Sequence, residues 1–255
     1  MLDFSSAVAR TPGNSLCRAI SDGELGSPDP ERARIQHVAY VDALEEAGLA
    51  VTLLPPLEAF PDSVFVEDTA VLLDEAVVLC HPGAGSRRGE VGAMQRDLRA
   101  LDFEMEAIRP PGTLDGGDVL RVGRRFFVGI SKRTNQKGFQ QFSTIVFRYG
   151  FSAVAVPVQA GLHLKSHVSL VDRNTLLLTP GMAQETAFSG FCHLVLPQSE
   201  AYAANCLALN GVVLVAAGFP ATREMLSRAG LHVRELDVSE FRRADGGLSC
   251  LSLRF

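Results

Sequence analysis

Four short segments of the chain concentrate the residue types that do chemistry in proteins. The first, residues 60–68, carries the three carboxylates of Asp62, Glu67 and Asp68 among apolar residues. Carboxylates this close repel one another, so the segment predicts a bound cation. A solvated acidic turn is the simpler interpretation when the segment is taken alone.

The second segment is a Gly-Gly pair, Gly116 and Gly117, between the carboxylates of Asp115 and Asp118. Glycine has no Cβ, so the pair permits positive φ angles and lets the backbone approach a ligand closely. The two acids would then lie at defined positions beside that ligand. An ordinary turn is the alternative.

The third segment is predicted to be a strand that carries His163, Lys165 and His167. Side chains two residues apart lie on the same face of a strand, so all three would share one polar face. That face is a site if it points inward and only surface if it points outward. A single histidine in an apolar strand is more often structural than catalytic.

The fourth segment contains Cys250, which follows a Gly-Gly turn at the start of the last predicted strand. Most cysteines are small buried hydrophobes. A cysteine that acts as a nucleophile needs its thiolate form, which nearby cations or a bound cationic substrate would stabilise.

A cysteine, a histidine and several carboxylates together suit one reaction well. The thiolate of Cys250 would attack a planar cationic carbon, the carboxylates would hold its positive charge, and His163 would move protons. A guanidinium group has such a carbon, and its planar donors match carboxylates. His163 and Cys250 could trap zinc adventitiously, but no metal-ligand spacing is present, so we expect no metal and no cofactor.

Polar positions in these segments recur at a nearly constant step along the chain. Glu67, Asp115, His163, Asn205 and Ser249 are separated by 48, 48, 42 and 44 residues. A step of this size is typical of propellers and other repeat arrays. Five strand-strand-helix-strand units, closed by joining the two ends of the chain, would bring all five positions to one central opening. A generic α/β fold with short hairpins is the alternative.

Pairs of predicted strands alternate with helices along the chain, as such repeats require. One helix begins at Asp29 and Pro30, which suit its N-cap and first turn, and ends near Gly48. The last strand, 248–255, has no partner after it, so we expect a strand near residues 7–9 to pair with it. The other predicted strands are residues 64–66, 70–73, 76–79, 119–122, 126–130, 168–171, 175–178, 206–209 and 212–215.

The composition limits the classes of protein to which the chain can belong. Its 255 residues are 47% hydrophobic and 21% charged, which is enough apolar material for a full core and excludes a disordered chain. The net charge of -5 leaves no excess of cations for phosphates, so nucleic-acid binding is not expected. No linker divides the sequence, so we expect a single catalytic domain over residues 1–255.

Apolar segments and cysteines predict where the protein is found. No run of about 18 apolar residues predicts a membrane span, and the first residues lack the basic and apolar regions of a secretory signal. Five cysteines without paired spacing favour free thiols in a reducing cytoplasm. We therefore expect a cytoplasmic monomer or homodimer that acts on a small molecule.

These polar segments, in order, resemble the dimethylarginine dimethylaminohydrolase family over nearly the whole chain. Each motif is weak by itself, but seven in the same order at matching separations are specific. The resemblance implies the fold of the guanidino-group-modifying superfamily, a five-bladed α/β propeller of ββαβ repeats with pseudo-fivefold symmetry. The motifs that carry the resemblance are residues 65–68, 82–88, 114–118, 131–135, 162–165, 203–206 and 248–250.

The resemblance also implies an activity, the hydrolysis of asymmetric dimethylarginine and monomethylarginine to citrulline and dimethylamine or methylamine. In this pattern Cys250 is the nucleophile and forms a covalent S-alkylthiouronium intermediate. His163 protonates the departing amine and then activates water. Asp115 orients His163 and stabilises its cationic form.

Substrate-binding roles follow from the same resemblance. Asp62, Glu67 and Asp68 would engage the cationic groups of the substrate. Arg87 and Arg133 would hold its α-carboxylate, for which a guanidinium fork has the right geometry.

The resemblance further assigns contacts made by the backbone and by a loop. The backbone of Ala244 would meet the α-amine of the substrate. A loop over residues 16–26 would form a lid, with Ile20 at the position of the family's lid contact. Cys206 belongs to a family motif, but we expect it to be structural.

Two other functions stay open at this point. An arginine or agmatine deiminase would use the same thiolate chemistry, but arginine deiminases are longer and carry an acid two residues after the catalytic histidine. This chain has Lys165 there, which weakens a second carboxylate grip and leaves room for a methylated nitrogen. The other alternative is a catalytically silent methylarginine-binding protein, against which the presence of Cys250, His163 and Asp115 argues.

Overall fold

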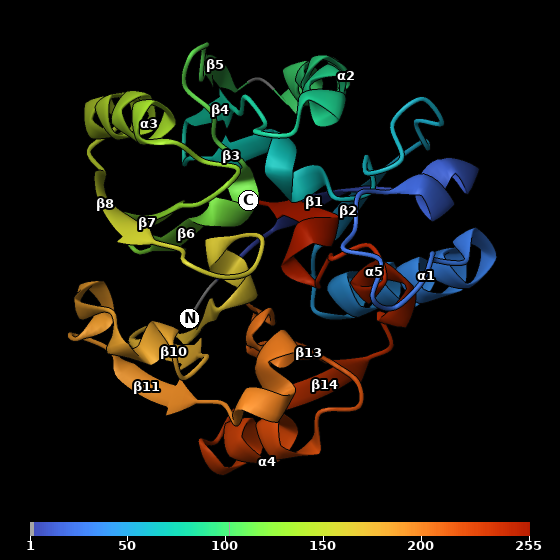
Figure 1. Cartoon of the computed structure of the whole chain (residues 1–255), viewed down its shortest axis with the longest axis vertical. Helices are drawn as coiled ribbons and strands as arrows, with labels where there is room; N and C mark the ends of the chain where they lie inside the picture. Colours follow the sequence, from blue (N-terminus) through green and yellow to red (C-terminus); the bar gives the residue numbers. More distant parts are fainter. Residues whose placement is uncertain (1–2, 102) are drawn as a thin grey trace.

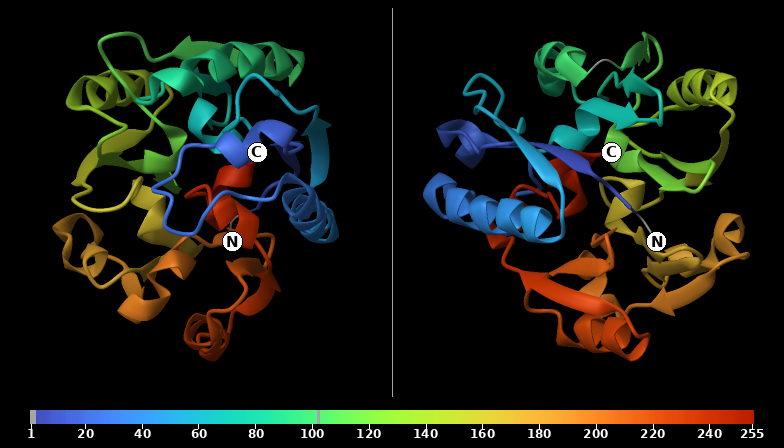
Figure 2. Two further views of the ribbon diagram at one scale, coloured as in Figure 1. Left: turned by 45° about the vertical axis from the view of Figure 1, so that its right-hand side comes forward. Right: turned by 180° about the vertical axis from the view of Figure 1, so that it is seen from behind.

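The computed structural model describes residues 3–101 and 103–255. Five three-stranded sheets form a ring, and the longer helices lie on its outside (Figure 1). The turned views show the same ring obliquely and from behind (Figure 2). The fold is therefore the five-bladed α/β propeller that the spacing of the polar residues predicts.

All five sheets share one strand order and one set of directions. Two strands pair as an antiparallel hairpin, and a third strand, reached by a crossover, runs parallel to one of them. Four blades follow one another along the chain. The first two consist of β3 (Ala70–Leu72), β4 (Ala76–Leu79) and β5 (Glu104–Ala107), and of β6 (Val119–Val122), β7 (Arg125–Ile130) and β8 (Ser152–Pro157). The next two consist of β9 (Val168–Asp172), β10 (Thr175–Leu178) and β11 (Cys192–Val195), and of β12 (Leu207–Leu209), β13 (Val212–Ala216) and β14 (His232–Leu236).

The remaining blade joins the two ends of the described chain, as expected from the unpaired last strand. It contains β1 (Ser6–Arg10) between β15 (Ser252–Arg254) and β2 (Ala50–Leu54). β1 is antiparallel to β15, with Val8 opposite Leu253, and parallel to β2. This pairing closes the ring and brings the segment before β15 to the centre of the molecule.

Helices fill the crossovers of four blades, namely α1 (Pro30–Glu46), α2 (Arg88–Leu98), α3 (Gln136–Arg148) and α4 (Pro220–Arg228). The carboxylate of Asp29 caps α1 as predicted, because it accepts backbone N–H groups of the first turn. The blade of β9 to β11 departs from the expected repeat, since its crossover has two short 3-10 turns in place of an α-helix. Pro180 and Gly181 stand where a helix would begin, and the glycine disfavours one.

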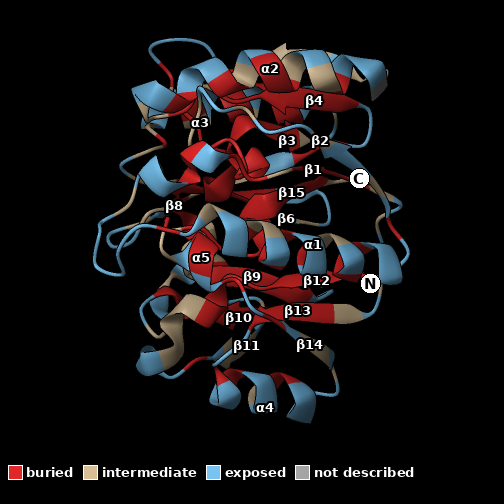
Figure 3. Ribbon diagram, turned by 90° about the vertical axis from the view of Figure 1, so that its right-hand side faces the viewer, coloured by how far each residue is buried: buried red, intermediate tan, exposed pale blue. Residues whose placement is uncertain are grey.

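Burial follows the ring. Most residues of the hairpin strands are buried, while the outer faces of the helices are exposed (Figure 3). Each blade packs its strands against its own crossover and against the next blade. A further short helix, α5 (Ser239–Arg242), lies beside α1. None of the helices in the described ranges is long and apolar enough to cross a membrane.

Three strand predictions at the centre of the ring are wrong. Residues 64–66 enter a 3-10 turn, Val66–Thr69, and the segment after His163 is a 3-10 turn, Leu164–Ser166. The last strand is also shorter than predicted, because a 3-10 turn, Ser249–Leu251, precedes β15. A strand sends neighbouring side chains to opposite faces, whereas a tight turn can bury several consecutive polar residues on the inner side.

Candidate active site

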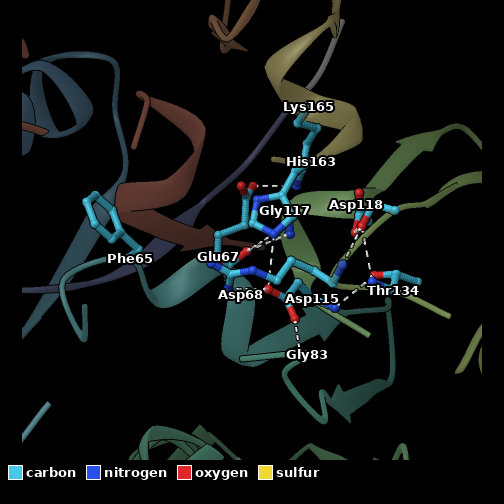
Figure 4. A network of polar contacts seen from close by, with 12 residues as sticks. Phe65, Glu67, Asp68, Gly83, Asp115, Gly117, Asp118, Thr134, His163 and Lys165 are labelled. Carbon is cyan, nitrogen blue, oxygen red and sulfur yellow. Dashed lines mark hydrogen bonds and ion pairs between the residues drawn. The ribbon is translucent and has the colours of Figure 1, made fainter. Parts of the chain in front are cut away.

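The repeated polar positions meet on the inner side of the ring. The Oγ of Ser249 donates to Oε2 of Glu67 at 2.8 Å, and Nδ2 of Asn205 donates to that Oγ at 3.0 Å. Nε2 of His163 lies 3.0 Å from Oδ2 of Asp115 (Figure 4). Residues that are far apart in the sequence therefore form one polar cluster, as the repeat predicts.

His163 and Asp115 form a buried acid–imidazole pair. The other oxygen of Asp115, Oδ1, accepts the backbone N–H of Gly83 at 2.8 Å, which holds the carboxylate in place. Burial disfavours the imidazolium form of His163, but the charge of Asp68 and the hydrogen bond with Asp115 outweigh burial and raise the pKa of His163 to about 9. His163 is therefore a proton donor at neutral pH.

Two glycines next to Asp115 leave space for neighbouring segments of the site. A Cβ on Gly116 would lie 2.0 Å from the backbone oxygen of Glu67, and one on Gly117 would lie 2.6 Å from Nδ1 of His163. Neither glycine has a positive φ, so the conformational freedom that glycine permits is not used here. Their role is to let other protein segments pack closely against the turn.

Cys250 and His163 line the same cavity, which has a volume of about 200 Å³. Gly117, Tyr202 and Asn205 form other parts of its wall. Burial and the negative charges of Glu67 and Asp68 raise the pKa of the Cys250 thiol to about 12. The resting form is therefore a thiol, and a cation beside it would favour the thiolate.

Position distinguishes Cys250 from the other four cysteines. Cys80 and Cys206 are also buried, and burial raises the pKa of both thiols. Cys17 and Cys192 are exposed. Cys250 alone of the five lines the cavity that contains His163, so it is the cysteine that the geometry selects as a nucleophile.

The acidic segment contains one carboxylate that a buried arginine neutralises. Asp68 pairs with Arg87 and accepts the backbone N–H of Gly117 at 2.9 Å. Burial opposes ionisation, but the charges of His163 and Arg87 lower the pKa of Asp68 to about 2. Asp68 is thus an anion beside the cavity, 3.9 Å from Nε2 of His163.

The other two carboxylates of that segment have different surroundings. Glu67 lies 2.6 Å from Nζ of Lys165 and 3.1 Å from Nη2 of Arg254. Asp62 forms no ion pair with any described residue, and it accepts the backbone N–H of Ile20 at 3.0 Å. Burial raises the pKa of Asp62. At Glu67, Lys165 and Arg254 provide the cation predicted for the segment. The carboxylate of Asp62 remains available to a cation of the substrate.

Arg87 and Arg133 differ in how many donors are already used. Arg87 is buried, and its guanidinium bonds to Asp68, to Glu90 and to two backbone carbonyl oxygens. Arg133 is partly exposed, and within the described chain its side chain bonds only to Asp115, at 3.3 Å. Arg133 can therefore accept a carboxylate ligand directly, whereas Arg87 would first exchange one of its present acceptors.

The loop predicted as a lid contacts acids of the site through its backbone. Ile20 donates its N–H to Asp62, as described above, and Asp22 donates its N–H to Oδ2 of Asp245 at 2.9 Å. Asp245 lines the cavity. These two hydrogen bonds hold the loop 16–26 at the acids on the rim of the site.

Ala244 directly precedes the cavity-lining Asp245, which has a positive φ of 55°. The backbone N–H of Ala244 is already used, because it donates to the carbonyl of Phe241 at 3.0 Å. Only the carbonyl oxygen of Ala244 is therefore available to a ligand. A carbonyl accepts hydrogen bonds, so the ligand group that it suits is a donor such as an ammonium.

Asp68, Asp115 and His163 each place one possible metal-ligand atom within 4.8 Å of the others. These atoms already bond to one another, to Arg87 and to Arg133. The hydrogen-bonded ion pairs account for the clustering without a metal ion.

Sequence reasoning placed Asp118 beside a ligand and gave Thr134 no role, but Asp118 does not line the cavity and both residues are buried next to the site. Thr134 accepts the backbone N–H of Asp115 at 3.1 Å, and Asp118 accepts that of Leu164 at 2.8 Å. The position of Asp118 directly after the Gly-Gly pair was the available signal. Nothing in the sequence shows which backbone groups these side chains bind.

Comparisons with known proteins agree with this geometry. The family model described as N,N dimethylarginine dimethylhydrolase, eukaryotic, matches residues 27–185. The N(G),N(G)-dimethylarginine dimethylaminohydrolase of Pseudomonas aeruginosa is 41% identical over 99% of this chain and 100% of its own length. That of Streptomyces coelicolor is 35% identical over 97% of this chain and 96% of its own.

Solved structures give the same result. The Pseudomonas aeruginosa enzyme, as a cysteine-to-serine mutant complexed with citrulline, superposes with a TM-score of 0.97 at 40% identity and full coverage of both chains. A histidine-to-glycine dimethylarginine dimethylaminohydrolase adduct with S-methyl-L-thiocitrulline gives a TM-score of 0.96 at 40% identity, covering 99% of this chain and all of that one. The N-terminal domain of the arginine dihydrolase ArgZ shares the fold, with a TM-score of 0.88 at 21% identity over 98% of this chain and 97% of that one.

Proposed function

The chain belongs to the dimethylarginine dimethylaminohydrolase family, and on that basis we propose how its residues hydrolyse Nω-methylated arginines to citrulline and an amine. The enzyme acts on a C–N bond of a linear amidine and forms a covalent cysteine intermediate. The observation that carries the assignment of residues is that Cys250 and His163 line one cavity beside buried carboxylates.

Cys250 is the nucleophile of the proposed mechanism. Its thiol releases a proton to solvent when the guanidinium of the substrate enters, because that cation offsets the charges of Glu67 and Asp68 that raise the thiol pKa. The thiolate then bonds to the guanidinium carbon, and the bond from that carbon to the methylated nitrogen breaks. The step yields an S-alkylthiouronium intermediate and an amine.

His163 donates its proton to the departing amine and becomes neutral. The neutral imidazole next takes a proton from water as the hydroxyl adds to the thiouronium carbon. The thiolate of Cys250 leaves, the hydroxyl proton passes to solvent, and citrulline is released. Asp115 orients the imidazole throughout and stabilises its charged form, a role that the 3.0 Å contact supports.

Three carboxylates engage the cationic groups of the substrate in this proposal. Asp68 is ionised and lies beside His163, which places it near the guanidinium. Asp62 has no ion pair among the described residues and lies under the loop that carries Ile20. Glu67 acts through its charge, because its oxygens already bind Lys165 and other donors.

The amino-acid end of the substrate meets basic and backbone groups. Arg133 binds its α-carboxylate with the donors that the protein leaves unused, and Arg87 joins it only by exchanging one of its present acceptors. The carbonyl oxygen of Ala244 accepts a hydrogen bond from the α-ammonium. The side chain of Ile20, which is half-exposed, covers the bound molecule when the loop 16–26 is in place.

Replacing Arg133 with alanine is expected to raise KM for asymmetric dimethylarginine by about tenfold or more while kcat changes less. A carboxylate clamp that does not contact the reacting carbon binds the ground state and the transition state alike, so its loss appears mainly in KM. Steady-state kinetics of Arg133→Ala and Arg133→Lys measure the effect. An unchanged KM in Arg133→Ala would remove this residue from the clamp.

Measuring citrulline release from asymmetric dimethylarginine, monomethylarginine and unmethylated arginine tests the function as a whole. We expect turnover of the methylated substrates. Turnover of unmethylated arginine instead would identify an arginine deiminase, for which the comparison with ArgZ supports only the fold. Binding of methylarginine without turnover would identify a silent binding protein and refute the proposal.

The proposal extends to the organisation and location of the enzyme. We propose that residues 1–255 act as one catalytic domain, as a monomer or homodimer, without a metal or cofactor. The free cysteines support a reducing compartment such as the cytoplasm. The substrate is a small molecule, as citrulline and S-methyl-L-thiocitrulline are in the related structures.

A further inference from the structure

Asp118 is a fully buried carboxylate that the proposed mechanism does not use. It forms no ion pair with any described residue, and its partners are all hydrogen-bond donors. Oδ1 accepts the backbone N–H of Leu164 at 2.8 Å, and Oδ2 lies 2.7 Å from the Oγ of Ser131. Thr134 bonds to the same carboxylate (Figure 4). A buried carboxylate with three such partners has a defined position.

The bond from Ser131 to Asp118 has only one possible direction. The Oγ of Ser131 accepts two backbone N–H groups, that of Arg133 at 2.9 Å and that of Thr134 at 3.1 Å. A hydroxyl has two lone pairs and one hydrogen, so the hydrogen of Ser131 must point to Asp118. Asp118 therefore sets the orientation of Ser131 and, through it, the turn that carries Arg133.

Asp118 is connected to the catalytic pair by three further routes. Leu164 directly follows His163, so the bond to its N–H fixes the start of the 3-10 turn that holds the imidazole. The backbone N–H of Asp118 donates to the carbonyl of Asp115 at 3.0 Å. Thr134, which bonds to Asp118, also accepts the N–H of Asp115.

The sequence leaves room for the carboxylate at one position on the neighbouring strand. A Cβ on Gly129 of β7 would lie 2.6 Å from Oδ1 of Asp118. The φ of Gly129 is not positive, so conformational freedom does not explain this glycine. Space for Asp118 does explain it, together with the packing of Leu164 and Val158 nearby.

We propose that Asp118 is a positioning residue for the reaction, because its carboxylate ties together the three segments that carry Asp115, His163 and Arg133. The inference rests on the proposed function. A carboxylate offers only acceptors to the N–H and the two hydroxyls that surround it. An asparagine amide at this position would point its NH2 group at one of these three donors. An alanine would leave the N–H and both hydroxyls without an acceptor.

The variant Asp118→Asn tests the proposal with the smallest change in volume. We expect its kcat/KM for asymmetric dimethylarginine to fall by about tenfold or more, since small displacements of reacting groups cost rate steeply. The charge of Asp118 also helps to raise the pKa of His163. The alkaline limb of the pH profile of kcat/KM should therefore move to lower pH in the variant, which a loss of stability alone does not cause.

Glu240→Gln is the matched control for the loss of a buried carboxylate. Glu240 is as deeply buried, and it accepts the backbone N–H of Asp29 at the start of α1. We expect Glu240→Gln to lower the melting temperature but to keep the wild-type pH profile. A folded Asp118→Asn with wild-type kcat/KM and an unmoved alkaline limb would overturn the proposal.

A second variant tests the proposal even if Asp118→Asn does not fold. Ser131→Ala removes the hydroxyl that links Asp118 to the backbone N–H of Arg133. We expect it to raise KM more than it lowers kcat. An unchanged KM would refute the link to Arg133. Wild-type turnover in the same assay keeps the outcomes separate, because an inactive wild-type enzyme would refute the proposed function itself.

Discussion

Replacing Cys250 with serine is expected to abolish citrulline formation while the protein still folds and binds methylarginine. The two side chains differ by one atom, so the cavity keeps its shape. A serine hydroxyl is a far weaker nucleophile near neutral pH than a thiolate, and no nearby group is placed to activate it, since His163 is already protonated. Citrulline release measures turnover, and titration calorimetry measures binding.

Cys206→Ser is the control for that experiment. Cys206 is as deeply buried as Cys250, and burial likewise raises the pKa of its thiol to about 12. It does not line the cavity that contains His163, so its serine variant should keep nearly full activity. Retention of more than a few per cent of activity in Cys250→Ser would show that another group attacks the substrate.

The spacing of polar residues predicted a closed five-unit array but left a generic α/β fold open until the family resemblance was added. Glu67, Asp115, His163, Asn205 and Ser249 recur because each stands at the same point of a blade. At the centre, His163 bonds to Asp115, and Ser249 bonds to both Glu67 and Asn205. The unpaired last strand predicted the closure of the ring, which β1 and β15 provide. Both features are repeated or follow from simple pairing, so a single sequence displays them.

Local structure around the site could not be predicted in the same way. The apolar residues Val64, Phe65 and Val66 are typical of a strand, but Glu67 and Asp68 are both buried in the 3-10 turn that follows. A strand would send these two neighbouring side chains to opposite faces. Whether an acid meets a substrate or a protein cation also depends on distant residues. Nothing near Glu67 in the sequence indicates that Lys165 pairs with it.

The roles of Arg87 and Asp118 illustrate the same limit. The family resemblance assigns Arg87 to the carboxylate of the substrate, yet the guanidinium of Arg87 bonds to Asp68 and Glu90. Asp118 stands three residues after Asp115 in the sequence and has the same side chain. Its partners, Ser131 and Leu164, come from two other segments, and only the three-dimensional arrangement identifies them.

Replacing His163 with glycine is expected to lower kcat by at least about 100-fold, which is the lower end of the usual contribution of general acid–base catalysis. Without the imidazolium, the amine departs unprotonated and water is not activated. The pH profile adds a signature. The pKa of His163 is about 9, and its protonated form is the acid, so wild-type kcat/KM should fall as pH rises through that value. The variant should lack this alkaline limb.

Chemical rescue distinguishes loss of the proton donor from general damage to the site. Glycine leaves a space beside Asp115, and added imidazole should enter it and restore part of the activity. His193→Ala is the control, because His193 lies on β11 and bonds to the carbonyl of Phe188, away from the cavity. A near-normal rate in His163→Gly, or an unchanged alkaline limb, would assign the proton transfers to a different residue.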